Sequence, residues 1–297
     1  MKTPLNDEPV TDESVTTARR LDASAVHAVL RRLLRQPEPP WLHGEVARRM
    51  AERLAIIRMK PALLFDWWGH LGASAEVLAQ VCPKAQRFAV EPSAALLERS
   101  AATAPALPTR AELPAGAQLV WANMMLHLVP DPPLLIERWH RLLAVDGFVM
   151  FSCLGPGTLR ELRALYERLG WPAPTPDFID MHDFGDMLVR AGFADPVMDQ
   201  ETLSLRWDSA EALLAELRAL GGNAAPDRMP GLRSPRWRST LLRELESLKG
   251  TDGKLGLSFE IAYGHAFKAA PSLKVAEAAV LSLEDMRAML RSDAARR

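Results

Sequence analysis

Hydrophobic and polar positions follow two periods along most of the chain. Short apolar runs of strand length recur, and between them apolar residues return every three or four positions, as on one face of a helix. The expected strands are 62–66, 87–91, 117–123, 147–154, 196–207 and 257–268. Strands separated by helical stretches predict right-handed β–α–β units, so we assign the chain to the α/β class with a mostly parallel sheet.

The helical pattern begins before the first strand. Two amphipathic helices are expected at 22–35 and 44–59, and the prolines of "QPEPPW" separate them because proline cannot continue a helix. Later helices are expected at 73–81, 93–101, 130–145, 158–170, 181–193, 209–222 and 234–248. The last two form a helical insertion, about 209–252, between the closing strands. We expect this insertion to be a lid, because ligands of open α/β sheets gather at the carboxyl ends of the strands.

These patterns divide the chain of 297 residues into three parts. Residues 1–40 hold a polar start, expected to be disordered over 1–20, and the N-terminal helix. Residues 41–268 form the main α/β domain. Residues 269–297 form an Ala-rich tail in which "LEDMRAMLRS" predicts one peripheral helix.

Composition excludes several classes of protein. The formal net charge of −1 gives no global field for nucleic acid or for an anionic membrane. The polar N-terminus lacks the apolar core of a signal peptide, and no run of about 18 apolar residues predicts a membrane span. Cys82 and Cys153 make no disulfide framework, and the scattered histidines have no metal-ligand spacing. We therefore expect a cytoplasmic protein, a monomer without a metal, that binds neither nucleic acid nor membrane.

The stretch "LLFDWWGHLGAS", residues 63–74, predicts a strand, a turn and the start of a helix. Turns of this kind hold nucleotide cofactors in many α/β proteins and are normally rich in glycine, which lets the ligand approach the backbone closely. Here two tryptophans and a histidine occupy the turn.

Four stretches carry a resemblance to a known family. They are "EVARRMAERL", "FSCLGPGTLRELR", "DMHDFGDMLVRAGFADPVMD" and "LSFEIAYGHAFK". With the order of elements, they resemble the class I S-adenosylmethionine-dependent methyltransferases, and among these the malonyl-acyl-carrier-protein O-methyltransferases of biotin synthesis. The resemblance covers about 41–268. It implies a Rossmann-like, seven-stranded, mostly parallel sheet with helices on both faces, N-terminal helices and a helical insertion before the last strand.

The resemblance also assigns cofactor residues around the turn. In the family an acidic residue precedes a G-x-G-x-G turn. Here Asp66 is the acidic residue, and the glycine positions fall on Trp68, His70 and Gly72, with Gly69 one place out of register. The turn is thus degenerate. Trp68 could rotate away and line the cofactor site, or Trp67 and Trp68 could fill it.

Further along, the resemblance assigns three more positions. Glu91, at the end of the second strand, corresponds to the acidic residue that binds the ribose, and its spacing of about 20 residues from the turn fits that role. The third strand looks missing or degraded, and Arg110 or Glu112 stands where the family has an Asp near the adenine. Asn123 matches a position facing the cofactor's methyl group, and His127 follows it, either towards the substrate or as an ordinary core histidine.

Binding of a malonyl group on an acidic carrier protein would need cations or hydrogen-bond donors. The candidates are Arg160, the basic face of Arg48, Arg49 and Arg53, and "RSPRWRS" (233–239) in the insertion, although each could be simply solvated. The family often covers its substrate with an N-terminal tyrosine, and Trp41 could replace it. The expected partner is thus an acyl-carrier protein or its malonyl thioester.

The sequence shows no paired carboxylates and no Ser-His-Asp set, and we assign no catalytic residue. Methyl transfer to an ionised carboxylate needs positioning and water exclusion rather than acid–base groups. Three readings stay open: an active O-methyltransferase, a non-catalytic protein of the same fold that binds a partner or carrier, and a methyltransferase for another acceptor such as RNA. The degenerate turn favours the second reading, and the long family-specific stretches favour the first.

Overall fold

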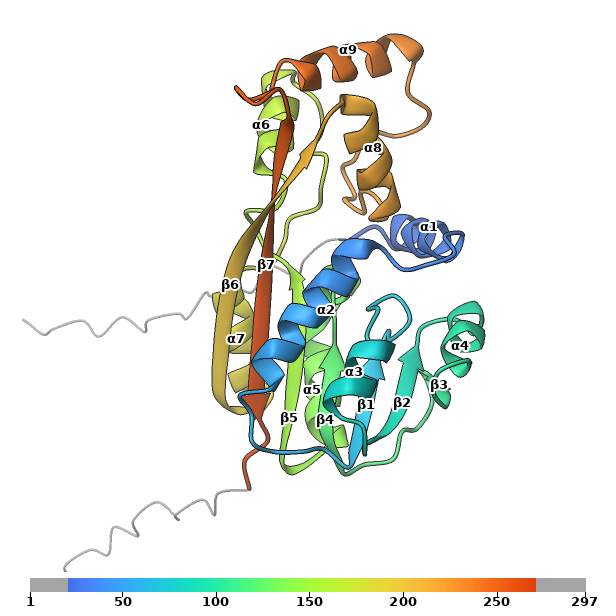
Figure 1. Cartoon of the computed structure of the whole chain (residues 1–297), viewed down its shortest axis with the longest axis vertical. Coiled ribbons are helices and arrows are strands. Elements are labelled where there is room, and N and C mark those ends of the chain that lie inside the picture. The colour runs from blue at the N-terminus through green and yellow to red at the C-terminus, as the bar shows by residue number, and fades with distance from the viewer. Residues whose placement is uncertain (1–20, 271–297) are drawn as a thin grey trace, which may run out of the picture.

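In a computed structural model, which describes residues 21–270, the chain forms one seven-stranded sheet with helices on both faces (Figure 1). The strand order is β3-β2-β1-β4-β5-β7-β6. The strands are β1 Leu63–Trp67, β2 Gln86–Glu91, β3 Ala106–Pro108, β4 Ala117–Ala122, β5 Leu143–Leu154, β6 Ala194–Trp207 and β7 Leu255–Phe267. The first five are parallel, and β7 pairs antiparallel with both β5 and β6. The predicted Rossmann-like fold is confirmed.

Two helical layers cover the sheet, and each encloses a core. The helices are α1 Ala23–Leu34, α2 Trp41–Leu54, α3 Ala75–Val81, α4 Ala94–Ala101, α5 Pro132–Leu142, α6 Arg160–Arg168, α7 Met181–Arg190, α8 Ala210–Ala219 and α9 Pro235–Glu246. One core packs α2, α3 and α6 against Leu64, Leu119 and Trp121. The other packs α5 and α7 against Phe65, Val120 and Phe151. Successive strand residues thus serve opposite layers, as the alternation of side chains along a strand requires.

Several predicted element boundaries differ from the structure. The third strand exists but has only three residues, Ala106–Pro108, which is too short to give a readable alternation. Helix α2 begins at Trp41 rather than Gly44 and ends at Leu54 rather than 59. Helix α5 ends at Leu142 rather than 145, and β5 starts at Leu143 rather than Gly147, so the expected last turn of the helix is strand.

The parallel strands point upward in Figure 1, and the insertion lies above their carboxyl ends, at the top of the picture. It holds α8 and α9 between β6 and β7. The N-terminal helix is tied to it: the Nε2 of Gln36 donates to the carbonyl of Ala219 over 2.7 Å, and the Nη1 of Arg228 pairs with Asp22 over 2.6 Å. The insertion and α1 therefore cover one edge of the sheet together.

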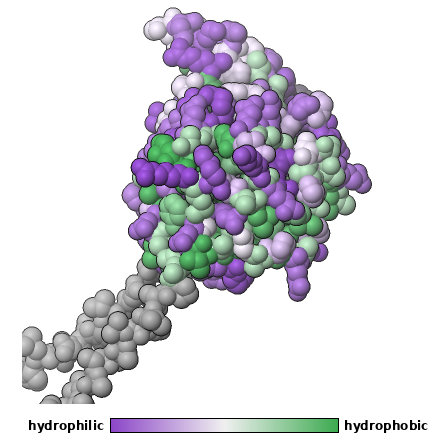
Figure 2. All heavy atoms as spheres, turned by 60° about the horizontal axis from the view of Figure 1, so that its bottom comes forward, coloured by the Kyte–Doolittle hydropathy of each residue, from purple (hydrophilic) through white to green (hydrophobic). Residues whose placement is uncertain are grey.

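The remaining surface is ordinary for a folded domain. Figure 2 brings the bottom of Figure 1 forward and shows apolar patches interspersed with hydrophilic side chains. Within residues 21–270 no helix combines the length and the apolar character that a membrane span requires. Both cysteines, Cys82 and Cys153, are buried free thiols, as expected. The predicted disordered start at 1–20 and the tail helix lie outside the described residues.

Candidate cofactor and substrate site

The turn after β1 keeps the backbone shape of a glycine turn although a tryptophan occupies it. Trp68 adopts a φ of 57°, in the left-handed region that favours glycine. Its N–H donates to the carbonyl of Val90 over 2.8 Å, and its carbonyl accepts from the N–H of Gly72 over the same distance. Holding a bulky residue in this conformation costs roughly 1–3 kcal/mol. The chain therefore pays backbone strain to preserve the turn.

The two retained glycines are needed by their neighbours. A Cβ on Gly69 would overlap the carboxylate of Asp66, and a Cβ on Gly72 would lie 2.9 Å from the Oγ of Ser74. The Nδ2 of Asn123 donates to the carbonyl of Gly72 over 2.6 Å and to that of His43 over 2.8 Å. Its Oδ1 accepts from the Oγ of Ser152. Asn123 thus fixes the turn against α2 and β5.

Both predicted carboxylates beside the turn are fully buried. Glu91 is 0% exposed, and its Oε1 accepts from the N–H of His70 over 2.9 Å and from the Oγ of Ser100 over 2.6 Å. Within the described part of the chain its Oε2 and both carboxylate oxygens of Asp66 have no hydrogen-bond partner. Burial raises the pKa of each group to about 7. In Asp66 the charge of Arg87, 3.6 Å away, opposes this rise.

A pocket of about 700 Å³, which we call the turn pocket, lies at the carboxyl ends of β1, β2, β3 and β4. Trp67 and Trp68 form one wall and α1 covers it. Its other walls include Pro92, Ser93, Thr109, Arg110, Met125, Leu128, Val129 and Arg138. Its size is typical of small-molecule sites, and its aromatic and apolar walls suit a planar ring. Neither Glu91 nor Asp66 lines it, and Asp66 instead lines a separate pocket with Gly69, His70 and Arg87.

The two tryptophans are packed in the core. Trp67 is 1% exposed and meets Trp139 edge-to-face with ring centroids 5.9 Å apart. The guanidinium of Arg138 lies over the Trp67 ring, 5.1 Å from the ring centroid. Trp68 is 7% exposed and belongs to the same apolar cluster as Val29 and Leu33 of α1. The indole of Trp68 is therefore part of the packing between the turn and α1.

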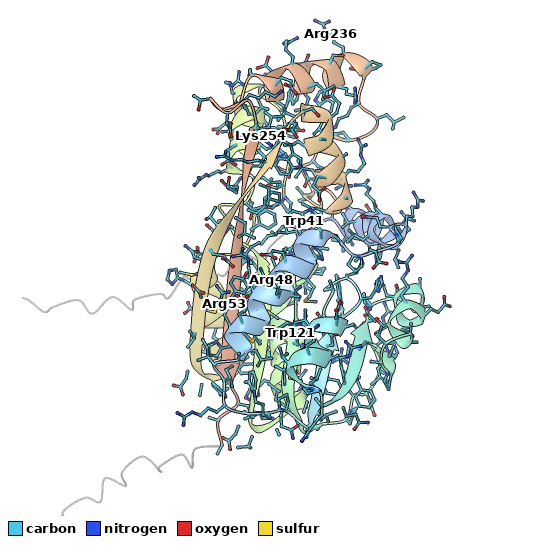
Figure 3. All side chains as sticks on the ribbon, viewed as in Figure 1. Trp41, Arg48, Arg53, Trp121, Arg236 and Lys254 are labelled. Atoms are coloured by element: carbon cyan, nitrogen blue, oxygen red, sulfur yellow. The ribbon has the colours of Figure 1, made fainter. Side chains whose placement is uncertain are left out.

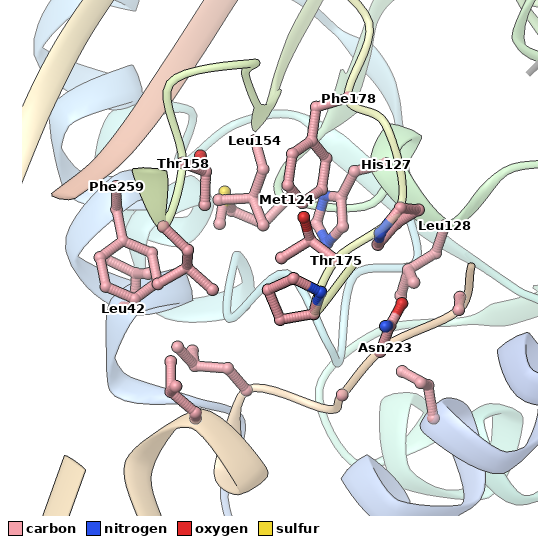
Figure 4. A pocket seen from close by; sticks show the side chains of 18 of the residues that line it. Leu42, Met124, His127, Leu128, Leu154, Thr158, Thr175, Phe178, Asn223 and Phe259 are labelled. Atoms are coloured by element: carbon pink, nitrogen blue, oxygen red, sulfur yellow. The ribbon is translucent and has the colours of Figure 1, made fainter. Parts of the chain in front are cut away.

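A second pocket, of about 120 Å³, lies beneath the insertion (Figure 4). This insertion pocket is lined from α2, the ends of β4 and β5, the 169–180 segment and the insertion, by residues that include Leu42, His43, Met124, His127, Leu154, Thr158, Thr175, Phe178, Asn223 and Phe259. It shares Leu128 with the turn pocket. The two pockets are therefore neighbours, one on each side of the β4 loop.

The insertion pocket is uncharged. No Lys, Arg, Asp or Glu stands among the described residues that line it. Burial lowers the pKa of His43 to about 4, so its ring is neutral at pH 7, and its Nδ1 lies 2.7 Å from the carbonyl of Leu71. His127 is 8% exposed and meets Phe178 edge-to-face at 6.3 Å. The pocket thus offers a low dielectric with a few neutral polar groups.

Three of the six non-glycine residues with a positive φ in the described part of the chain line the two pockets. Met124 and Leu159 line the insertion pocket with φ of 52° and 55°, and Trp68 lines the turn pocket with a positive φ as well. Non-glycine residues in this region persist where the surroundings hold them, often at functional sites. The strain at these three residues fits a candidate functional site at the carboxyl edge of the sheet.

The structure brings together only part of the predicted substrate residues. His127 lines the insertion pocket. Trp41 is 50% exposed at the start of α2 and does not line it, whereas its neighbours Leu42 and His43 do. Arg160 is exposed and pairs with Glu161 over 3.2 Å, also outside this pocket. Their substrate roles, like the cofactor roles of Asp66, Glu91 and Asn123, stay predictions.

The basic face of α2 is neutralised by acidic partners. Arg48 and Arg49 pair with Glu45 over 2.8 and 2.7 Å, and Arg49 also pairs with Glu201 of β6 over 2.7 Å. Arg53 pairs with Asp199 over 2.8 Å. Figure 3 shows Arg48 and Arg53 along α2, on the side towards β6. This face therefore fixes α2 to β6 rather than presenting free cations.

Sequence reasoning missed Thr158, Thr175 and Phe178. Thr158 lies inside the "FSCLGPGTLRELR" stretch, so a signal was available for it. Thr175 and Phe178 follow α6 in an irregular segment with no periodic pattern, and only the folded chain places them beside His127.

Comparison with curated proteins gives clear relatives. The chain is 37% identical over 257 residues to the malonyl-acyl-carrier-protein O-methyltransferase of Gallionella capsiferriformans, covering 81% of this chain and 88% of the relative. It is 36% identical over 248 residues to the protein of the same name from Laribacter hongkongensis, covering 77% and 83%.

The chain belongs to the malonyl-acyl-carrier-protein O-methyltransferase family. Halorhodospira halophila has a further member, 34% identical over 84% of this chain and 86% of its own length. The resemblance read from the sequence is thereby confirmed. No model of a known protein family matches the chain.

Solved structures with the same fold are more distant in sequence. The YcgJ protein of Bacillus subtilis aligns with a TM-score of 0.51 at 10% identity, over 75% of this chain and 99% of that protein. A putative methyltransferase from Bacillus halodurans aligns with a TM-score of 0.50 at 12% identity, over 75% and 98%. At such low identities these matches show only that the chain shares its fold with the two solved structures.

Proposed function

We propose that the chain transfers a methyl group from S-adenosylmethionine to the free carboxylate of a malonyl thioester on acyl-carrier protein, a step in biotin synthesis. Membership of the family supports this proposal, and so does a neutral, apolar pocket at the carboxyl edge of the sheet, beside the turn pocket. The neutral pocket is the structural observation that carries it.

The charge balance of the reaction explains why a neutral pocket suits it. A carboxylate anion and a sulfonium cation become a neutral ester and a neutral thioether. The transition state therefore carries less charge than the separated reactants, and a low-dielectric site with little water favours it. The uncharged lining of the insertion pocket meets this condition, and a carboxyl group is already ionised at neutral pH. No general base is required.

The turn pocket fits the cofactor in size and position. S-adenosylmethionine supplies the activated methyl group when it is bound. Trp67 and Trp68 would form the wall for its adenosine part, and Leu128 would separate its pocket from that of the acyl group. The buried carboxylate of Asp66, which faces Arg87, and Oε2 of Glu91, which has no hydrogen-bond partner in the described residues, would suit its ammonium and hydroxyl groups if the indole of Trp68 turned aside.

A carrier protein would dock on the outer surface of the insertion. The candidates for this contact are Arg236 and Arg238, which are exposed on α9. The arginines of α2 are less suitable, because they already form ion pairs with acidic side chains. Figure 3 places Arg236 at the far end of the molecule from the amino edge of the sheet. Acidic carrier surfaces are attracted to such cations.

One observation favours a second function. Trp68 is packed in the core, and Glu91 and Asp66 are buried behind the turn. A chain that bound a carrier protein without turnover would show this arrangement. Mass spectrometry of malonyl-loaded carrier protein, incubated with the chain and S-adenosylmethionine, separates the two. Methyl ester on the carrier supports the enzyme, and carrier binding without ester supports the alternative.

A further inference from the structure

Thr175 is an unusual residue in the insertion pocket. The residue is buried, with 7% of its surface exposed, and its Oγ1 has no hydrogen-bond partner within the described part of the chain. Pro174 and Pro176 flank it and line the same pocket. Because both prolines have a fixed φ, the backbone around Thr175 is stiff. The hydroxyl is therefore held in place without a partner of its own.

Two other neutral polar side chains that line the pocket, Thr158 and Asn223, are hydrogen-bonded within the fold. The Oγ1 of Thr158 donates to the carbonyl of Glu260 over 3.0 Å and accepts from its N–H over 3.2 Å. The amide of Asn223 bonds to Ala173 and Ala225, each over 2.8 Å. Thr175 differs from both, because its hydroxyl has no hydrogen-bond partner in the described residues. Figure 4 shows Thr175 in the pocket, near Met124 and His127.

A buried hydroxyl without a partner costs folding free energy, because it has lost its hydrogen bonds to water. Such a group calls for an explanation, and a ligand atom is one. Among the described residues that line the pocket there is no Lys or Arg for an acyl carboxylate, so an anionic substrate depends on neutral donors there. A hydroxyl that donates to a carboxylate oxygen makes a short, charge-assisted hydrogen bond.

We propose that Thr175 is a substrate-binding residue whose Oγ1–H donates a hydrogen bond to a carboxylate oxygen of the acyl group. This inference rests on the proposed function, because it names the group that the acyl carboxylate meets. Through this hydrogen bond, the pocket would bind a carboxylated acyl group more tightly than an uncharged acyl group of similar size.

The test uses the full chain with Thr175→Val, which keeps the shape and removes the hydroxyl, and Thr175→Ser, which keeps the hydroxyl. Thr158→Val is the matched control, because it removes a hydroxyl that the fold uses. Binding of malonyl-loaded and acetyl-loaded carrier protein is measured by calorimetry, and thermal unfolding is measured without ligand.

We expect Thr175→Val to weaken malonyl-carrier binding about tenfold, the loss of one good hydrogen bond, and to leave acetyl-carrier binding unchanged. Thr175→Ser should bind the malonyl carrier nearly as the wild type does. The unfolding temperature of Thr175→Val should equal or exceed that of the wild type, whereas Thr158→Val should unfold at a lower temperature. A purely structural threonine would behave like Thr158.

The inference is overturned if Thr175→Val binds the malonyl carrier as the wild type does, if it unfolds as early as Thr158→Val, or if the wild type does not distinguish malonyl from acetyl carrier. These readouts need no turnover. A wild type that prefers the malonyl carrier but forms no ester would refute the proposed methyl transfer and leave the binding role of Thr175 standing.

Discussion

The backbone N–H of His70 donates a hydrogen bond to Oε1 of Glu91 over 2.9 Å, which ties the turn after β1 to the end of β2. Ser100 donates to the same oxygen. The carboxylate that the family resemblance assigns to the ribose thus also organises the turn. One oxygen holds the turn, and the other, Oε2, is buried without a partner in the described residues.

Glu91→Ala should therefore change two quantities. The affinity for S-adenosylmethionine should fall by about 1.5–3 kcal/mol, the scale of hydrogen bonds to a charged group, and the free energy of unfolding should fall because two donors lose their acceptor. Glu91→Gln keeps a side-chain oxygen for His70 and Ser100, so it isolates the effect of the charge. Calorimetry and urea unfolding measure the two quantities. An affinity that neither substitution alters would remove Glu91 from the cofactor site.

Replacing Trp68 and His70 together by glycine should strengthen cofactor binding, because it uncovers Asp66 and Glu91. The loss of a buried indole costs about 3–5 kcal/mol of stability, offset in part by relief of the left-handed strain at Trp68. The folded fraction is measured first, by circular dichroism, and binding by calorimetry.

Trp68→Leu is the control for this pair, because it removes the indole but keeps a Cβ in the left-handed conformation. It should recover less binding than the glycine variant. If the glycine variant is folded and binds no better than the wild type, the indole does not cover the site.

The buried carboxylates predict a pH dependence of stability. The pKa of Asp66 rises in the folded chain from 3.8 to about 7, so the folded state holds more protons than the unfolded state between these values. The free energy of unfolding contributed by this group therefore falls as the pH rises through that window. Asp66→Asn should flatten the fall and be more stable than the wild type at pH 8.

The lowered pKa of His43 has the opposite effect, because it favours the folded state as the pH rises from about 4. This effect is the same in the wild type and in Asp66→Asn, so it cancels when the two proteins are compared. Urea unfolding at several pH values measures the difference. A difference between the two chains that is constant from pH 4 to 8 would contradict the raised pKa of Asp66.

Charge reversal on α9 tests the docking surface. Arg236→Glu with Arg238→Glu should raise KM for malonyl-loaded carrier protein, more strongly at low salt, because exposed charges are screened at high ionic strength. Catalysis on a small malonyl thioester without the carrier should be unchanged. Lys84→Glu is the control, because this exposed lysine precedes β2 at the opposite edge of the sheet. Equal KM values for both variants would place the carrier elsewhere.

The sequence predicted those parts of the fold that have a period. Strand β6 alternates every two residues, and the amphipathic helices α5 and α7 repeat every three to four. Strand β5 is instead recognised by a continuous apolar run, as in a strand buried on both faces. Strand β3 could not be recognised, because three residues give no alternation. The join of α5 to β5 at Leu143 could not be located either, because no glycine or proline separates the two elements.

Residues of the candidate site could be predicted only where their spacing along the sequence is characteristic. Asp66 and Glu91 could be singled out because they lie at the ends of two consecutive strands, β1 and β2. The walls of the insertion pocket come from distant segments, so Thr175 gave no signal. On α2, residues one apart point about 100° apart, given 3.6 residues per turn. Leu42 therefore lines the pocket while Trp41 is half exposed.

The most direct test of the account is a calorimetric titration of the intact chain with S-adenosylmethionine, beside the variant with glycine at positions 68 and 70. We predict saturable binding of one cofactor per chain, weak in the wild type and stronger in the variant. Absence of binding in both folded proteins would contradict the assignment of the turn pocket to the cofactor, and with it the proposed methyl transfer. Tight binding by the wild type would mean that the indole of Trp68 lines the site without covering it.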